Sequence, residues 1–255
     1  MANNVIIYEQ PLNELIRVCL RLEQVFLQID HNLADQTTLG TRNLIVTIIQ
    51  LLSLLDRPDI KAKLAKELTH HMTLLAPLEK TPKIDQDKLK VLLKQLDELS
   101  RTFIDSSGKI GQNLREIELF NTLRLHLSSP GGGCSFDVPV YHYWLQLPIK
   151  ERQATITSWL EEFSKIRLAV ELTLQLIREG TKTQKRVAEK GFYQEQLDPQ
   201  TSLRLIRVAV PPNIEAYPEI SVSRHFVGVR FYSPNIHERP TQYPENISFL
   251  LSYCS

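Results

Sequence analysis

The residues with the clearest potential for chemistry lie in the segment 129–147. Three adjacent glycines (131–133) precede Cys134 there, and an aromatic run that contains His142 follows. A Cys and a His can act as nucleophile and base, and a glycine-rich turn can hold a phosphate. The Gly-Lys-Ser/Thr ending of a phosphate loop is missing, and no neighbouring residue marks a site that stabilises the Cys134 thiolate. We therefore favour a structural connector between helices. The aromatic side chains that we expect to bury against the helical core are Phe136, Tyr143 and Trp144.

The remaining histidines and acids form no catalytic or metal-binding pattern. His70 and His71 are adjacent, so they point to different faces of a helix and cannot supply the i, i+4 pair of a metal site. Asp85 and Asp87 fall at the start of a predicted helix, where acids favour the helix dipole. Dinucleotide, nucleophile-elbow and zinc-protease motifs are missing. We expect no catalytic residue, no cofactor and no metal, hence a binding or scaffolding protein. The alternative to a binding or scaffolding protein is an enzyme that uses Cys134 as its nucleophile.

Two arginines are the residues that indicate a binding site. Arg17 and Arg21 are four residues apart, so they share one face of the first predicted helix, and Glu14 is the one acid beside them. The guanidinium fork suits the capture of carboxylates. A pair of solvated surface side chains explains the spacing slightly better, and the sequence leaves both interpretations open.

The elements that position these residues change character near residue 180. Before it, apolar residues recur at three- and four-residue steps; after it, they alternate. The first helix should begin after Pro11 with Asn13 as its cap, and another should be capped by Asp85. The other predicted helices cover residues 38–56, 59–78, 112–127, 139–147, 150–163 and 166–178. The predicted strands cover residues 192–193, 202–210, 226–231 and 246–253, with 5–8 as a further candidate.

The pattern predicts an α+β fold. We expect an all-helical domain over residues 1–180 and a mostly antiparallel β-sheet domain over 181–255, and the β-branched residues 5–8 can add a strand to that sheet. Residues 181–190, which include Lys182 and Lys185, are interpreted as a basic loop.

Several arginines fall on or beside the strand patterns. If they lie side by side on one sheet face, they form either a solvated antiparallel face or a nucleic-acid-binding module assisted by Phe226, Phe231 and Tyr232. The arginines concerned are Arg204, Arg207, Arg224 and Arg230. The balance of 30 Lys and Arg against 29 Asp and Glu counts against a general nucleic-acid binder.

Composition narrows the class further. The three cysteines of the 255-residue chain are far apart and form no Cys-x-x-Cys pair, which favours a reducing compartment over a disulfide framework or a zinc site. No secretory signal and no uncharged apolar run of membrane-spanning length is visible. We expect a cytoplasmic protein.

Four blocks of sequence resemble the ZapD family. They follow one another in the family's order and span nearly the whole chain, and the third, with its Pro-Gly-Gly, Cys-Ser-Phe-Asp and Trp-Leu, is the most specific. The blocks are residues 8–23 (Tyr-Glu-Gln-Pro-Leu-Asn-Glu, then Arg17 and Arg-Leu-Glu), 110–116 (Ile-Gly-Gln-Asn-Leu-Arg-Glu), 129–147 and 191–194 (Gly-Phe-Tyr-Gln).

The resemblance implies a function. Proteins of this family are cytoplasmic division factors that bind the C-terminal tail of the tubulin-like GTPase FtsZ and cross-link its filaments at the Z-ring, at mid-cell. It also implies a symmetric homodimer and a basic binding surface. The positions that match basic residues of the family are Arg17, Arg21, Arg57, Arg115, Arg224 and Arg230. Glu118 stands where the family leads us to expect a basic residue.

Overall fold

The computed structural model describes residues 5–81, 84–181, 183–198, 200–235 and 237–255. The chain divides into two compact units. Unit 1 joins residues 1–17 to 174–255, and unit 2 comprises residues 18–173. The dividing points fall inside two helices, α1 and α9.

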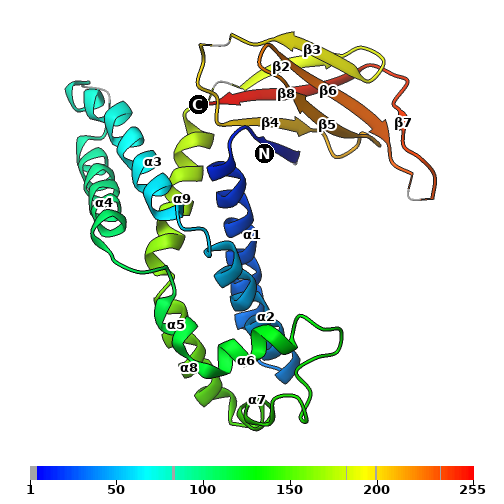
Figure 1. Cartoon of the computed structure of the whole chain (residues 1–255). Coiled ribbons are helices and arrows are strands. Elements are labelled where there is room, and N and C mark those ends of the chain that lie inside the picture. The colour runs from blue at the N-terminus through cyan, green and yellow to red at the C-terminus, as the bar shows by residue number, and fades with distance from the viewer. Residues whose placement is uncertain (1–4, 82–83, 182, 199, 236) are drawn as a thin grey trace. The chain divides into compact units, whose positions relative to one another are not determined.

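The helices precede nearly all of the strands, so the predicted α+β class is confirmed (Figure 1). Their caps follow from local sequence: Asn13 Oδ1 accepts a hydrogen bond from the Ile16 N–H at 2.8 Å, and Asp85 Oδ1 accepts one from the Lys88 N–H at 3.1 Å. The helices are α1 (Glu14–Ala34), α2 (Thr38–Leu54), α3 (Ile60–Leu75), the 3₁₀ helix η1 (Ala76–Lys80), α4 (Gln86–Asp105), α5 (Gln112–Glu116), α6 (Glu118–His126), α7 (Pro139–Leu145), α8 (Ile149–Glu161) and α9 (Ser164–Glu179).

The single helix expected over residues 112–127 is wrong, because Ile117 adopts an extended conformation and separates α5 from α6. Leu114 and Phe120 are both fully buried. Six residues apart on a continuous helix, they would face different sides, since each residue turns the helix by about 100°. The break at Ile117 allows both side chains to enter the core of unit 2.

Unit 1 contains two four-stranded antiparallel arrays. Sheet A has the order β1-β4-β8-β2; sheet B has the order β3-β6-β5, with β7 paired to β6. The expected N-terminal strand is confirmed, because Ile6 to Pro11 pair with Val210 to Leu205. The strands are β1 (Ile6–Pro11), β2 (Thr183–Ala188), β3 (Phe192–Gln196), β4 (Leu205–Val210), β5 (Tyr217–Val222), β6 (Phe226–Ser233), β7 (Thr241–Gln242) and β8 (Ile247–Cys254).

The basic loop expected over residues 181–190 is wrong over most of its length. Residues 183–188 form β2, which pairs with β8, and Lys182 lies outside the described residues. The turn is confined to Lys190 and Gly191, both with positive φ (47° and 74°), which is the geometry of a two-residue hairpin. The polar side chains of β2 are tolerated because β2 is an edge strand with one solvated face.

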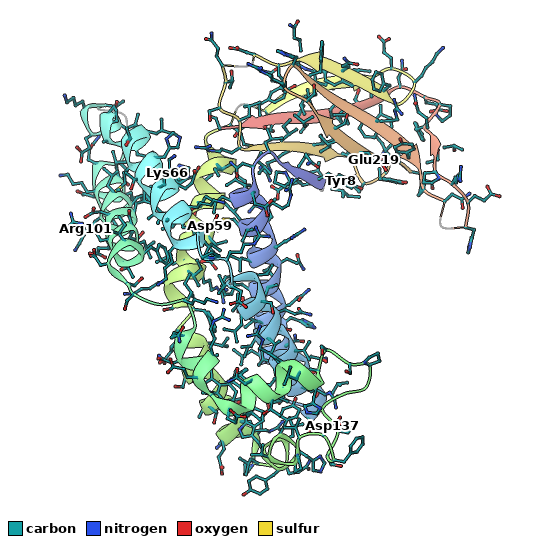
Figure 2. All side chains as sticks on the ribbon, viewed as in Figure 1. Tyr8, Asp59, Lys66, Arg101, Asp137 and Glu219 are labelled. Carbon is teal, nitrogen blue, oxygen red and sulfur yellow. The ribbon has the colours of Figure 1, made fainter. Side chains whose placement is uncertain are left out.

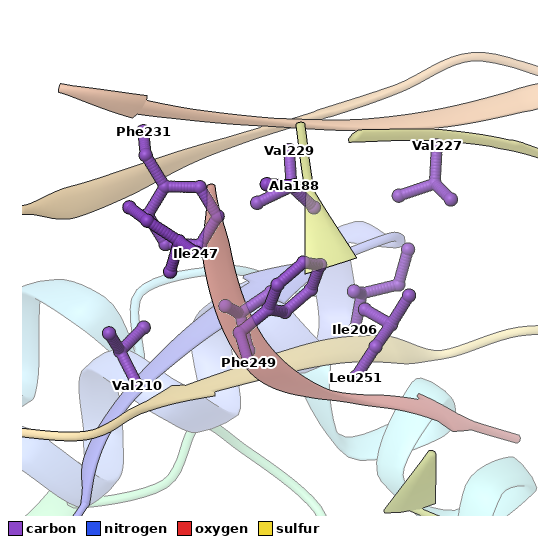
Figure 3. Packing of buried hydrophobic residues seen from close by; sticks show 10 residues of the cluster. Ala188, Ile206, Val210, Val227, Val229, Phe231, Ile247, Phe249 and Leu251 are labelled. Atoms are coloured by element: carbon purple, nitrogen blue, oxygen red, sulfur yellow. The ribbon is translucent and has the colours of Figure 1, made fainter. Parts of the chain in front are cut away.

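The two sheets enclose the core of unit 1 (Figure 3). Val227, Val229 and Phe231 of sheet B meet Phe249 and Leu251 of sheet A, and all are at most 2% exposed. These residues alternate along their strands with solvated ones, which is the period-2 pattern seen in the sequence.

A charged clamp fixes the start of the chain within unit 1. Glu9 on β1 accepts hydrogen bonds from Arg178 Nε and Nη2 in the last turn of α9, at 2.9 and 2.7 Å. Arg207 Nε on β4 lies 2.9 Å from the same carboxylate. Since each of the three side chains is at most 25% exposed, the clamp is better shielded from solvent than a surface ion pair.

Candidate functional site

Arg17 and Arg21 lie one turn apart on α1, and both are exposed. Arg17 Nη1 donates to Glu14 Oε2 at 2.7 Å, so part of its charge is neutralised within the helix. Arg21 makes no hydrogen bond or ion pair with any described residue. An unpaired guanidinium keeps all of its donors available for a carboxylate from another molecule.

Arg21 stands at the rim of an open groove of about 510 Å³ between α1 and α2. Val25, Ile49 and Leu54 give this groove an apolar lining. An adjoining depression of about 340 Å³ shares Ile49, Gln50 and Ser53 with it and extends toward α6. We call the two together the α2 groove. Its lining residues are Arg21, Gln24, Val25, Gln28, Val46, Ile49, Gln50, Ser53, Leu54, Arg124, Leu127 and Ser128.

Three cations converge on Asp56, directly after α2. Lys109 Nζ and Arg115 Nη1 each lie 3.0 Å from Asp56 Oδ1, and Arg124 Nη2 lies 3.4 Å from Oδ2. The hydrogen bond from Lys109, followed by the charges of Arg115 and Arg124, holds the pKa of Asp56 below its usual value despite partial burial. Three positive charges against one negative charge leave a local excess of two. Arg57, the next residue, is half-buried.

Arg115 differs from Arg21 in its surroundings. Its side chain is 10% exposed, and besides its contact with Asp56 it donates to the carbonyl of Leu52 at 2.6 Å and to that of Ile110 at 3.4 Å. The guanidinium therefore ties the end of α2 to the start of α5 within unit 2. A buried guanidinium with these partners stabilises the structure beneath the groove and is not itself open to a binding partner.

Arg224 and Arg230 belong to unit 1. Arg224 is exposed in the turn between β5 and β6 and has no hydrogen bond or ion pair with a described residue. Arg230 lies on the outer face of sheet B, with its guanidinium carbon 5.3 Å from the centroid of the Phe192 ring. Stacking of this kind leaves the guanidinium edge open to a carboxylate.

The strand arginines do not share one sheet face. Arg207 lies on the outer face of sheet A against Glu9, whereas Arg230 lies on the outer face of sheet B, on the opposite side of the sandwich. Phe231, one of the aromatics of the nucleic-acid interpretation, is fully buried between the sheets. Phe226 and Tyr232 share the outer face of β6 with Arg230, but Arg207 and Phe231 do not, so the full set of residues named in this interpretation does not form one face.

The expectation for the aromatics of segment 129–147 is wrong for two of the three. Phe136 and Tyr143 are 81% and 68% exposed. Trp144 is half-buried, and its ring centroid lies 5.6 Å from that of Trp159. The buried tyrosine is Tyr141, because the inward face of α7 passes through residues 138, 141 and 145, and this phase turns Tyr143 outward.

The thiol and the backbone N–H of Cys134 both make hydrogen bonds within the turn. Its thiol donates to the carbonyl of Gly131 at 3.1 Å, and its backbone N–H donates to Asp137 Oδ2 at 3.1 Å. Among the residues that the structure describes, no group of three or more His, Cys, Asp or Glu side chains is placed to hold a metal ion.

Sequence reasoning missed Lys109, Arg124 and the apolar lining of the α2 groove. Lys109 and Arg124 reach Asp56 across 53 and 68 residues of chain, so no local spacing connects them. The sequence indicated the apolar lining only in part. Ile49 and Leu54 fall on a helix whose apolar pattern predicts burial on most sides, and only the structure shows which side is open to the groove.

The fold and the site define an α+β protein with a basic, partly apolar groove on its helical unit. The model of the family described as "ZapD: Cell division protein" matches residues 20–230. The chain is 37% identical to "Cell division protein ZapD" of Coxiella burnetii (strain RSA 331 / Henzerling II), over all of this chain and 99% of that protein. It is 37% identical to the protein of that name from Methylococcus capsulatus, over 98% of both chains, and 32% identical to that of Azoarcus sp. (strain BH72), over 98% of this chain and all of the relative.

The chain therefore belongs to the ZapD family, and this membership supports a role in cell division. Within the described ranges, no helix combines the length and the apolar character needed to cross a membrane.

Proposed function

We propose that this chain is a non-enzymatic division factor of the cytoplasm that binds the C-terminal tail of FtsZ and, as a homodimer, cross-links FtsZ filaments at the mid-cell Z-ring. Membership in the family supports the division role. The observation that carries the binding mode is Arg21, a cation without a partner among the described residues, at the rim of a partly apolar groove.

The α2 groove suits a short segment that carries both acidic and apolar side chains. Arg21 pairs with a carboxylate of the tail, and the excess charge around Asp56 attracts further acids. Ile49 and Leu54 receive an apolar side chain. Each exposed ion pair contributes only about 0–1 kcal/mol, and the tail loses conformational freedom on binding, so the affinity of a single tail should be weak. Filament cross-linking then depends on two tail sites in one particle.

The other five arginines of the proposed surface take different roles. Arg17 and Arg57 extend the charge on unit 2 and the adjoining turn of α1. Arg115 supports the surface from within, because its donors are engaged by Asp56 and by two carbonyl groups. Arg224 and Arg230 are exposed cations of unit 1, and we propose them as tail contacts of that unit. Glu118, at the start of α6, lowers the local charge where a cation was expected.

The test is titration of an FtsZ tail peptide against the parent protein and Arg21→Glu. Reversing the charge should weaken binding about ten-fold, roughly 1–2 kcal/mol, and the loss should shrink as salt rises. Lys90→Glu is the matched control, because Lys90 is an exposed cation on α4 that no described acid pairs with. Folding, followed by circular dichroism, should be the same in all three proteins.

Co-sedimentation provides the second measurement. The parent should pellet with FtsZ polymers and should remain in solution when the FtsZ tail is deleted. Bundling by Arg21→Glu should fall more steeply than its affinity for one tail, since cross-linking needs two contacts at once. Equal peptide affinity for the parent and Arg21→Glu would show that the tail docks elsewhere.

A further inference from the structure

The outer face of sheet A in unit 1 carries an exposed apolar region. One row of paired residues crosses its four strands, and three of the four side chains are apolar: Ile7 on β1, Ala209 on β4, Leu250 on β8 and Lys185 on β2. In the adjacent row, Val187 pairs with Ser248. Ile7 and Val187 are 47% and 46% exposed. The solvated face of an antiparallel sheet ordinarily carries polar side chains, so this region is unusual for a face that water alone covers.

Alternation along the strands places these side chains outside the sandwich. Val208 and Val210 face the core of unit 1, so Ala209 between them faces outward. On β1, Tyr8 packs against the same core, which turns Ile7 outward (Figure 2 labels Tyr8). The apolar row therefore adds nothing to the core between the two sheets.

A groove of about 490 Å³ lies over this region, and all of its lining residues belong to unit 1. Ala209 and Leu250 contribute to it from the inner strands, and residues 211–213 (Pro-Pro-Asn) border it after the end of β4. We call it the sheet A groove. The residues that define it are Val5, Lys185, Ala209, Pro211, Ser248 and Leu250.

The charge of the sheet A groove has one sign. Lys185 is exposed, and its ammonium group makes no hydrogen bond or ion pair with any described residue. No acid is among the described residues that line the groove. The nearest charged row of the same face is already paired, because Arg207 Nε lies 2.9 Å from the carboxylate of Glu9. A lone cation beside an apolar groove favours a partner that brings apolar side chains together with a carboxylate.

We propose that the sheet A groove binds an amphipathic helix of a partner protein, with an acidic side chain of that helix paired to Lys185. An extended peptide would add to an edge strand, β1 or β2, and would leave Leu250 on the inner strand β8 uncovered. A helix about 10 Å in diameter spans two strand spacings of ~4.8 Å and so covers the inner strands together. Helices are also the elements that ordinarily cover the apolar face of a sheet in folded domains.

The inference goes beyond the proposed function, because the tail contacts proposed above include no residue of the sheet A groove. The α2 groove also combines cations with apolar side chains, and an acidic helix could bind there instead. The experiment therefore needs variants of both grooves.

The experiment follows the binding of three fluorescent peptides to the full chain by anisotropy. The first is an amphipathic peptide of Leu, Ala and Glu, about 18 residues long so that it can form a helix. The second has Lys in place of every Glu. The third has Pro in place of two central Ala residues, which breaks the helix. The parent should bind the first peptide about ten-fold more tightly than either of the others.

Substitutions then locate the site. Lys185→Glu should weaken binding of the acidic helix about ten-fold and should strengthen binding of the Lys peptide. Ser248→Glu, which places an acid inside the groove, should weaken the acidic helix as well. The controls are Arg239→Glu, an exposed cation of unit 1 with no described partner, and Arg21→Glu in the α2 groove; both should bind like the parent. Because the substituted side chains are all exposed, thermal unfolding should not change.

The outcomes separate the inference from the proposed function. No binding of the acidic helix by the parent, equal binding of the three peptides, or equal binding by the parent and Lys185→Glu would overturn the inference. Displacement of the helix by an excess of the FtsZ tail peptide would also overturn it, since the two would then share one site. Lys185→Glu should bind the tail peptide like the parent, so a failure of the proposed function would be seen in the tail titration alone.

Discussion

The α2 groove and the apolar end of unit 2 lie on the same helical unit, but they offer a partner opposite chemistries. The apolar end is the set of exposed hydrophobic side chains on the first turn of α2, on α6, on α7 and in the turn before α7: Leu39, Leu125, Phe136, Val140 and Tyr143. Around the groove, Lys109, Arg115 and Arg124 surround a single acid and Arg21 has no partner among the described residues, so the charge there is in excess. At the apolar end, Phe136 and its neighbours are exposed with almost no charge between them. A surface with excess charge of one sign selects a partner of the other sign, whereas an uncharged surface makes no such selection.

The two surfaces also differ in how they are built. The groove depends on side chains that meet across long stretches of sequence, with Arg115 joining α2 to α5. The apolar end depends on backbone geometry in one short turn, where Gly131 and Gly133 adopt positive φ. Substitutions can therefore damage one surface and spare the other, and this makes the comparison testable.

The largest expected effect is that of Arg115→Ala. The substitution leaves the Leu52 carbonyl without the Arg115 donor and removes one of the three cations bound to Asp56, in a half-buried site. The free energy of unfolding should fall by about 2 kcal/mol. Urea unfolding measures this loss. Arg124→Ala is the matched control: Arg124 is 37% exposed and 3.4 Å from Asp56, so its removal should cost less than about 1 kcal/mol. Equal losses would mean that Arg115 does not support the groove.

A somewhat smaller effect is expected from Gly132→Ala, which acts on the apolar end. A Cβ at this position would overlap the backbone carbonyl oxygen of His126, so the turn must shift, at a cost of about 1–3 kcal/mol. Urea unfolding should show this loss, while affinity for a single tail peptide stays constant. Gly131→Ala is the control: space is open there, and only the positive φ of 74° opposes the change, at about 1 kcal/mol. A larger loss for Gly131→Ala than for Gly132→Ala would contradict this account of the turn.

A weaker effect is expected from acid, and it acts on the groove. The folded state lowers the pKa of Asp56, so the unfolded state binds a proton more readily. The resulting stabilisation is fully present above the unfolded pKa, about 3.9, and is lost as pH falls through the lower folded value. Unfolding followed from pH 6 to pH 3 should show a decrease that Asp56→Asn reduces. A parallel decrease in both proteins would assign it to other carboxylates.

No loss is expected from Cys134→Ser. A serine hydroxyl can donate to the Gly131 carbonyl as the thiol does, and the turn should be retained. Bundling of FtsZ, measured by co-sedimentation, should match that of the parent. Lost bundling in a normally folded variant would favour a chemical role for Cys134.

Much of the fold could be predicted from the sequence because its signals are local. The caps Asn13 and Asp85 act within three residues, and the change of apolar period near residue 180 marks where strands replace helices. Residues 183–188 were misassigned because a polar edge strand has no alternation to detect. The partner strand β8 is also distant in sequence, since Thr183 pairs with Ser252 and Ala188 with Ile247.

Less of the candidate site than of the fold could be predicted from the sequence. The spacing of Arg17 and Arg21 indicates a shared helix face, but nothing in it distinguishes Arg17, paired with Glu14, from Arg21, which has no described partner. The packing of α2, α5 and α6 buries Arg115 and brings Lys109 and Arg124 into contact with Asp56, and the sequence does not show this packing. The sequence also does not show whether Tyr141 or Tyr143 is the more buried, because both are aromatic and only the phase of α7 decides which side chain faces the core.

The Glu9 clamp has a consequence for biosynthesis. Of the two arginines that bind Glu9 of β1, Arg207 on β4 leaves the ribosome only after more than two hundred residues have been made, later than Arg178 on α9. β4 in turn pairs with β8, which is made later still. Unit 2 is continuous in sequence and can fold during translation, whereas β1 has no partner strand until β4 has been made. Ile6 and Ile7 remain nearly half-exposed even after β1 has paired in the final structure. The newborn chain thus spends most of its synthesis with an apolar N-terminal strand available to chaperones.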